Sequence, residues 1–295
     1  MKLFDCTIYN NEDFIIETRL NILDKYFHKF IICEAKFTHD GQEKKLSFDI
    51  NKFAKFKKKI IYIVQDKEPS NLTAIDKKDI NYSDIRLNSI KRIASQRNKI
   101  SEALNGADNN DLIFYSDNDE IPNLDFLDLE KINKKIIIFE QKLFYYKFNL
   151  HMDKIFWYGT RAVKKKNLKT FEHLRNLKPK NYAFFRLDTF FNKNKSMNVE
   201  IVKNGGWHFT RIMSPAEIHK RELEGEHSDE YLKSNKNIKK IKDLIDRRVI
   251  DHDHLADKKD YKFGKEFKLK NFSINQLPNY IRENLEKYKN YLDLR

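Results

Sequence analysis

Residues 111–122, with the sequence DLIFYSDNDEIP, contain the side chains most suited to chemistry. The apolar run before them predicts a buried strand, and Asp117, Asp119 and Glu120 follow it directly. Like charges this close repel and raise each other's pKa unless a positive group lies between them. The pattern therefore favours a Mg²⁺ or Mn²⁺ site with a phosphate on its far side. A solvated acidic turn is the alternative, because the motif is short and common.

Length and composition indicate a globular protein. The chain has 295 residues, 40% of them apolar, which suffices for one large α/β domain or two small ones. No run of eighteen apolar residues occurs, and the N-terminal residues already resemble a strand, so we expect a soluble, cytoplasmic protein without a signal peptide or a transmembrane segment. Cys6 and Cys33 lie in apolar runs, where reduced, buried thiols are expected.

The chain is strongly basic. Lys and Arg total 58 against 44 acidic residues, which gives a net charge of +14. These charges are spread along the chain and form no zinc finger, recognition helix or arginine-rich arm, so we do not expect nucleic acid as a partner. A surface that attracts anionic substrates or phospholipid headgroups, with peripheral membrane contact, and a simple bias in amino-acid usage both stay open.

The first 120 residues alternate between strand and helix patterns. Helices are expected from about Glu12 and from about Ser83 to Asn105. Strands are expected at residues 3–8, 30–33, 60–64 and 112–115. This alternation predicts an α/β fold with a mainly parallel central sheet flanked by helices. Because ligands bind at the carboxyl edge of such sheets, Glu34 and the acidic turn should share that edge.

The second predicted helix carries an arginine in its apolar stripe. Ile90, Ile93, Ile100 and Leu104 keep a three-to-four spacing, and Arg97 completes it. A guanidinium that faces the sheet needs an anion or a route to water. Arg97 is therefore predicted to contact a phosphate or to brace the acidic turn, unless its stem packs and its head reaches solvent.

After Pro122 the pattern changes. Aromatic-rich strands are expected at 136–139 and 143–148, a turn with a glycine break at 156–161, and a polar connection at 164–180. A strand at 199–202 precedes Gly205-Gly206, where side chains are excluded. Ser214, Pro215 and Glu217 form a helix start, with that helix ending near Glu224.

The domain organisation follows from these patterns. Residues 1–237 are predicted to form the main domain, and residues 238–295 a lysine-rich helical C-terminal extension packed on it. The last helix should present Ile281, Leu285, Tyr288 and Leu292 on one face.

Several motifs, in this order, resemble a known enzyme family. They are Thr7-Ile-Tyr-Asn10-Asn-Glu12-Asp13, Glu17-Thr-Arg19-Leu20, Ile32-Cys-Glu34, Gln96-Arg97-Asn98, Ser116-Asp117-Asn-Asp119-Glu120-Ile-Pro122, Tyr145-Tyr-Lys-Phe-Asn149, Trp157-Tyr-Gly159-Thr and Gly205-Gly-Trp-His208-Phe. The set is similar to nucleotide-sugar glycosyltransferases of the GT-A fold, and more narrowly to glycosyltransferase family 17, over roughly residues 1–230. The type members of that family are the β-1,4-mannosyl-glycoprotein 4-β-N-acetylglucosaminyltransferases.

The resemblance implies a Rossmann-like GT-A domain, a UDP-sugar donor that is expected to be UDP-N-acetylglucosamine, and Mn²⁺ or Mg²⁺ at Asp117 and Asp119. The animal members begin with a membrane anchor, which this sequence does not show. A polysaccharide or a lipid-linked sugar is therefore expected as readily as a glycoprotein glycan acceptor.

Transfer from a nucleoside diphosphate sets the roles of the acidic residues. A cation would neutralise charge on the departing phosphate, with Asp119 as the first ligand and Asp117 reaching the ribose or a metal-bound water. His208, after the paired glycines, is predicted to complete the metal site, with a core histidine as the alternative. An inverting transfer also needs a general base, for which Glu120 is the first candidate, although a base so close to a cation would be weak.

The remaining candidates concern binding. Tyr9, Asn10 and Glu34 are predicted to bound the uracil and ribose pocket, against ordinary strand-end capping. Trp157 and Trp207 offer flat faces for stacking on a sugar ring, or are core residues.

Other histidines are weaker candidates for metal ligands. His227 follows the capped helix and is the second choice after His208. His252 and His254 have ligand-like spacing in a segment that is expected to be solvated.

Two other function classes compete with sugar transfer. A nucleotidyltransferase also places Asp-x-Asp at a strand end, but usually carries a glycine-rich loop after its first strand, and residues 7–13 contain no glycine. A non-catalytic carbohydrate-binding relative is the second alternative.

Overall fold

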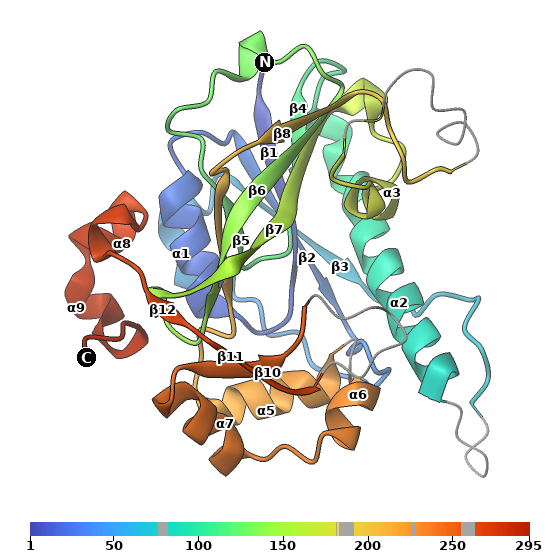
Figure 1. Cartoon of the computed structure of the whole chain (residues 1–295). Coiled ribbons are helices and arrows are strands. Elements are labelled where there is room, and N and C mark those ends of the chain that lie inside the picture. Colours follow the sequence, from blue (N-terminus) through green and yellow to red (C-terminus); the bar gives the residue numbers. More distant parts are fainter. Residues whose placement is uncertain (76–81, 181, 183–191, 226–227, 255–262) are drawn as a thin grey trace.

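A single ten-stranded sheet organises the molecule, with helices on both of its faces (Figure 1). The computed structural model describes residues 1–75, 82–180, 182, 192–225, 228–254 and 263–295. The main path of the sheet runs in the order β3-β2-β1-β4-β7-β6-β9-β5, while β12 pairs with β7 and β8 pairs with β6. Five of the nine described pairings in this sheet are parallel and helices flank it, so the predicted α/β class is confirmed.

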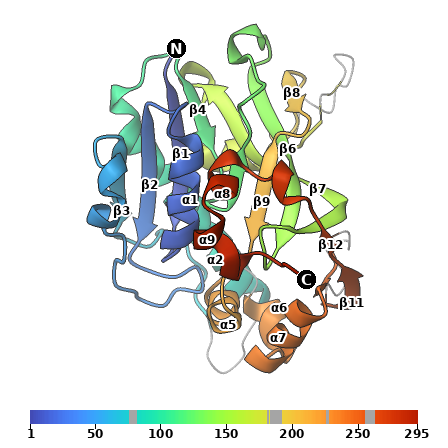
Figure 2. The same cartoon turned by 90° about the vertical axis from the view of Figure 1, so that its left-hand side faces the viewer.

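The first half of the sheet is parallel throughout. It consists of β1 (Leu3–Tyr9), β2 (Lys29–Ala35), β3 (Ile60–Gln65) and β4 (Leu112–Tyr115). The helices α1 (Asp13–Leu23) and α2 (Tyr82–Lys99) connect these strands and lie on opposite faces (Figure 2). As expected, β1 and β4 end at the same edge of the sheet, because they run parallel in neighbouring positions.

The apolar stripe of α2 is only partly as expected. Ile93, Ile100 and Leu104 are buried, but Ile90 is exposed. The α-helix also ends at Lys99 and continues as a 3₁₀ turn to Gly106, whereas the periodicity predicted one helix to about Asn105. The tighter winding still buries Ile100 and Leu104 against the sheet.

The second half of the sheet differs from the prediction. It consists of β5 (Glu120–Pro122), β6 (Ile136–Tyr145), β7 (Leu150–Lys164), β8 (Val199–Val202) and β9 (Gly206–Thr210). Residues 136–145 form one continuous strand instead of two. The expected turn at 156–161 lies inside β7, where Gly159 falls at a register shift against β6. An isolated glycine marked a bulge here, not a turn.

The remaining helices frame the sheet. The capping box of Ser214 and Glu217 starts α5 as predicted. The helices are α3 (Phe171–Asn176), α5 (Pro215–Glu224), α6 (Ser228–Lys233), α7 (Ile238–Asp246), α8 (Asn279–Glu283) and α9 (Leu285–Tyr288). Short 3₁₀ turns span Ile50–Phe56, Ile100–Gly106, Leu129–Lys131, Lys165–Asn167, Ile274–Gln276 and Lys289–Tyr291.

The C-terminal extension contains strands as well as helices. The strands β10 (Val249–His252) and β11 (Phe263–Lys268) pair with each other, and β12 (Lys270–Asn271) joins the main sheet through β7. These strands were not predicted, because they are short and rich in lysine and so show no clear alternation of apolar and polar residues. The final predicted helix is divided into α8 and α9, and Tyr288 lies fully buried against α1, with its hydroxyl 2.9 Å from that of Thr18.

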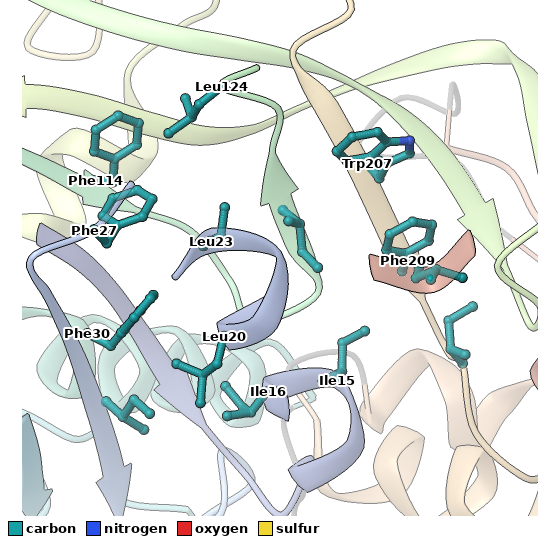
Figure 3. Close-up of a cluster of buried hydrophobic side chains, with 14 of the residues drawn as sticks. Ile15, Ile16, Leu20, Leu23, Phe27, Phe30, Phe114, Leu124, Trp207 and Phe209 are labelled. Carbon is teal, nitrogen blue, oxygen red and sulfur yellow. The ribbon is translucent and has the colours of Figure 1, made fainter. Parts of the chain in front are cut away.

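The main core lies between α1 and the sheet. Leu20, Leu23, Phe27 and Phe114 belong to it, and Trp207 and Phe209 extend it to β9 (Figure 3). Both cysteines are buried free thiols, as predicted. Among the described residues, no helix combines the length and apolar character that crossing a bilayer requires.

We expect His151 to make the protein less stable in acid. Its ring packs against Phe144 and Phe272, and burial lowers the pKa of His151 to about 4. The unfolded chain therefore takes up a proton near pH 6.5 that the folded chain refuses, so the free energy of unfolding falls as the pH drops from 6.5 towards 4. Because the ring is partly exposed, screening reduces this contribution to about 1 kcal/mol at pH 5. Urea unfolding at pH 7 and pH 5 should show a smaller loss in His151→Phe; equal losses in both proteins would contradict the assignment.

Candidate active site

The acidic turn borders a cleft at the carboxyl edge of the sheet. The cleft, which we call the central cleft, has a volume of about 260 Å³. Its walls include the end of β1, the turn after β4, one face of α2, the middle of β7 and of β9, and the C-terminal half of α5. The predicted site residues that line it are Tyr9, Asn10, Arg97, Asp117, Asp119, Glu120, Trp157 and His208.

Guanidinium groups bind both carboxylate oxygens of Asp117. Arg175 Nη2 lies 2.8 Å from Oδ2, and Arg97 Nη2 lies 3.5 Å from Oδ1. The Tyr115 hydroxyl also donates to Oδ1, at 3.1 Å. Burial alone would raise the pKa of Asp117, but the two guanidiniums outweigh it and hold the pKa well below its usual range. The positive charge that the acidic turn requires is thus supplied in part by arginine.

Arg97 braces the turn from α2. Besides Asp117, its guanidinium donates to the Tyr115 hydroxyl at 2.9 Å and to Glu172 at 3.0 Å. These contacts fit the predicted role of Arg97 in bracing the acidic turn.

Glu120 is enclosed by donors. Its Oε1 accepts from Trp157 Nε1 at 2.5 Å and from Arg175 at 2.8 Å, while Oε2 accepts from the Asp117 amide at 3.0 Å and from Arg175 at 3.2 Å. The residue is fully buried. A carboxylate whose oxygens are all occupied has no free position for an acceptor hydroxyl, so these contacts argue against Glu120 as the general base. They fit a role in holding the turn.

The segment 157–160, part of the motif resemblance, is built around Glu120. Trp157 donates to its carboxylate, and Thr160 Oγ1 donates to its carbonyl at 3.2 Å. A Cβ on Gly159 would lie 2.6 Å from the Glu120 carboxyl carbon and 2.2 Å from Gln141 Oε1. Gly159 is therefore needed because the side chain of Glu120 occupies the space beside it.

A deeper ion pair supports the turn from below. Arg19, on α1, binds both oxygens of Asp5 at 2.6 and 2.7 Å, and both side chains are about 1% exposed. The same guanidinium donates to the Glu120 carbonyl at 2.7 Å and to the Ser116 hydroxyl at 3.0 Å. Arg19 therefore fixes the backbone path of the acidic turn.

Asp119 and His208 both line the central cleft and lie side by side, because β5 and β9 are paired. The distance from His208 Nε2 to Asp119 Oδ2 is 3.4 Å, and both side chains keep slight solvent contact. Burial opposes the charged imidazole, but the Asp119 carboxylate outweighs it and raises the pKa of His208. The ring also packs on Trp157, with centroids 4.8 Å apart, which fixes its orientation.

These donors fit a divalent cation only in part. Within the described residues, no three His, Cys, Asp or Glu side chains converge as a complete metal site. Asp119 and His208 are close enough to share one cation, whereas Asp117 has both oxygens engaged by arginine. Magnesium is commonly held by one or two protein ligands together with substrate phosphates. The residues present therefore fit a site that the substrate completes.

The predicted donor-binding residues differ in their placement. Asn10 and Tyr9 both border the central cleft, but Tyr9 is buried, packs in the core against Phe48 and donates to Asp13. Glu34 lies at the expected edge, but its side chain is fully buried and bound by Lys44 and the Ser47 and Phe48 amides. Its contacts do not fit a direct role in binding a nucleoside and correspond to the structural alternative.

The two tryptophans also separate. Trp157 lies at the central cleft, whereas Trp207 points to the opposite face of β9 and into the core shown in Figure 3. Successive side chains of a strand alternate between faces, so His208 and Trp207 cannot both face the cleft. A sugar-stacking role for Trp207 is inconsistent with this position.

Arg175 and Arg19 are site residues that the sequence patterns did not reveal. Arg175 lies on α3, inside the stretch that was expected to be an irregular connection. Thr170 caps that helix by accepting from the His173 amide, a signal that could have revealed it. Among the weaker histidine candidates, His227 falls outside the described residues, and His254 contacts Tyr145 and lies beside Trp157.

One comparison with known proteins identifies a family. The model of glycosyltransferase family 17 matches residues 1–179. No curated protein matches the chain. A 2-C-methyl-D-erythritol 4-phosphate cytidylyltransferase from Francisella tularensis is similar to it at 12% identity and a TM-score of 0.30, over 56% of this chain and 74% of that one. A putative glucose-1-phosphate thymidylyltransferase from Bacillus anthracis is similar at 12% identity and a TM-score of 0.34, over 70% and 88%. Likeness at this level adds no functional argument.

The structure is an α/β sheet flanked by helices, with an acidic turn at the carboxyl edge of its parallel half. The family match covers more than half of the chain, and the chain belongs to glycosyltransferase family 17. It is thus a glycosyltransferase, an enzyme that takes a sugar donor and a glycan acceptor.

Proposed function

We propose that this enzyme transfers N-acetylglucosamine, or a related sugar, from a UDP-sugar to a glycan, with inversion at the anomeric carbon. The observation that carries the proposal is the Asp119–His208 pair, with 3.4 Å between Oδ2 and Nε2, in a cleft bounded by the ends of β1 and β4. Nucleotides bind at this edge of open α/β sheets.

Mn²⁺ or Mg²⁺ is the proposed cofactor. Asp119 and His208 would hold it, and diphosphate oxygens of the donor would complete its coordination. When bound, the cation would neutralise the charge that develops on the leaving diphosphate. Asp117 contributes through the guanidiniums that it holds in place.

The protein's own groups position the donor. Asn10 and His39 also line the central cleft and are proposed to hydrogen-bond the ribose and the base. Gln96 lines it too, but its amide is engaged by the Cys33 carbonyl, at 2.8 Å, and by His39. The Trp157 indole packs on the His208 ring and is itself held by Glu120, so the orientation of the imidazole depends on both. The acceptor is proposed to be a glycan, a polysaccharide or a lipid-linked sugar.

A panel of nucleotide sugars tests the proposal. Binding and slow hydrolysis would be measured for UDP-N-acetylglucosamine, UDP-glucose, UDP-galactose and GDP-mannose, each with and without Mn²⁺. We expect UDP-N-acetylglucosamine to bind best, and only with the metal. Equal binding with and without metal would contradict the proposed cofactor, and failure of every UDP-sugar to bind would contradict the proposed donor.

A further inference from the structure

A second cavity adjoins the central cleft. This side cavity has a volume of about 820 Å³ and lies between α2, α3 and β7. It shares four lining residues with the central cleft, namely Ile93, Arg97, Asp117 and Trp157. A molecule bound in it would therefore reach the acidic turn at Asp117 without contacting Asn10, which lines only the central cleft.

The wall of the side cavity on β7 is aromatic. Phe156, Trp157 and Tyr158 all border it; along the strand, Phe156 and Tyr158 point to one face and Trp157 to the other, and Phe156 is 47% exposed although it is large and apolar. Exposed aromatic faces are suited to packing on a sugar ring. This wall gives the side cavity the character of a saccharide site.

Three guanidiniums also line the side cavity, and one of them, Arg161, makes no ion pair with a described residue. Arg97 and Arg175 both pair with carboxylates. Arg161 instead donates to the carbonyls of Gly159, at 2.6 Å, and Leu177, at 3.4 Å. In the described part of the chain, no carboxylate lies within ion-pair distance of it, and its buried Nε has no hydrogen-bond partner.

The surroundings of Arg161 disfavour its charged form. Burial, together with the nearby charge of Arg175, lowers the pKa of Arg161 to about 9, so the group is still charged at pH 7. A buried charge without a counterion is destabilising, and an oxyanion in the side cavity would relieve it. Arginine is also the residue that best matches the geometry of carboxylates and phosphates.

We propose that the side cavity is the acceptor site and that Arg161 recognises an acidic group, a carboxylate or a phosphate, on the acceptor sugar. The inference rests on the proposed function for the identity of the cavity's occupant as acceptor. It adds the substrate class: the aromatic wall takes the sugar ring, and the uncompensated guanidinium selects acidic sugars over neutral ones.

Tryptophan fluorescence can test this directly. The chain has two tryptophans, and Trp207 is a core residue, so Trp207→Phe leaves Trp157 as a reporter in the side cavity. This variant would be titrated with glucuronate, glucose 6-phosphate and glucose, with and without UDP and Mg²⁺. We expect at least one acidic sugar to bind roughly tenfold or more tightly than glucose; the two acidic probes distinguish carboxylate from phosphate recognition.

Substitutions then assign the preference to Arg161. In the same background, Arg161→Met should reduce the preference for acidic sugars to less than about twofold, and Arg247→Met, which removes an exposed arginine, should leave it unchanged. A second pair of variants changes the exposed residue Phe156 and leaves buried Arg161 intact. Phe156→Glu should weaken the binding of acidic sugars several-fold relative to Phe156→Gln, because only glutamate adds a charge that repels them. Thermal unfolding identifies any variant that has lost its fold.

The outcomes separate the two proposals. Equal affinity for glucose and for both acidic sugars, or an acidic preference that survives Arg161→Met in a folded protein, would overturn the acidic-acceptor inference while leaving sugar transfer intact. Failure of UDP to bind would contradict the proposed donor, yet the titrations without UDP would still decide whether Arg161 selects an acidic sugar.

Discussion

Replacing Asp119 with asparagine should lower kcat/KM for sugar transfer by about 10³-fold, the range in which removal of one electrostatic stabiliser of a transition state falls. The substitution keeps the size of the side chain but removes the charge that faces His208 at 3.4 Å. The cation would then be held by the imidazole and the substrate alone. Steady-state kinetics with the best donor from the panel, at varied Mn²⁺, would measure the change, and we expect a raised requirement for metal.

A matched control uses another aspartate. Asp125 pairs with Lys25 at the surface, in a different pocket, so Asp125→Asn removes an equal charge without touching the central cleft. It should retain activity within about twofold, since exposed ion pairs contribute little. Full activity in Asp119→Asn, or equal losses in both variants, would contradict the role assigned to Asp119.

Replacing Arg19 with methionine should destabilise the protein by about 3–5 kcal/mol, because it leaves the buried Asp5 carboxylate without its counterion. This is a large share of the roughly 5–15 kcal/mol that holds an ordinary domain together. The loss should also loosen the acidic turn, since Arg19 donates to the Glu120 carbonyl. Urea unfolding at pH 7 measures the first effect, and donor affinity measures the second.

Two further variants separate charge from packing. Adding Asp5→Asn to Arg19→Met removes the unpaired charge and should restore part of the stability, but not the donor affinity. Arg247→Met, which breaks an exposed pair with Asp243 and Glu266, should cost less than about 1 kcal/mol. If Arg19→Met were as mild as Arg247→Met, the buried pair would not support the turn.

The sequence predicted the first half of the fold well because its patterns are strong. Four apolar runs separated by helical periodicity correspond to β1 to β4, and the acidic turn follows β4 as expected. The second half was predicted less well. Continuous aromatic runs do not reveal where a strand is bent. Gly159 therefore predicted a turn, whereas it lies at a bulge inside β7.

The candidate site shows why charge balance escapes sequence reasoning. The three carboxylates of the turn are visible together, but their partners come from distant positions: Arg97 is 20 residues from Asp117, Arg175 is 58, and Arg19 is 98. Bracing of the turn was among the roles predicted for Arg97, whereas Arg175 and Arg19 were not foreseen, because only the fold brings them near the turn.

Side-chain direction was the other missing quantity. Glu34 lies at the predicted strand end, but the loop with Lys44 and Ser47 folds over it and engages its carboxylate. In β9, the alternation of faces separates His208 from Trp207. The sequence shows that the two side chains point to opposite faces of the strand, but only the structure shows which of them faces the cleft.

The nitrogen of His208 offers the most direct test of the central claim, that Asp119 and His208 hold a cation completed by the donor. Mn²⁺ would be added to the protein with UDP, and electron spin-echo envelope modulation would be recorded. We predict modulation from a coordinated imidazole nitrogen in the native protein and its loss in His208→Gln, while His173→Gln, at a histidine outside the central cleft, retains it. Bound Mn²⁺ without nitrogen modulation in the native protein, or unchanged modulation in His208→Gln, would contradict the account.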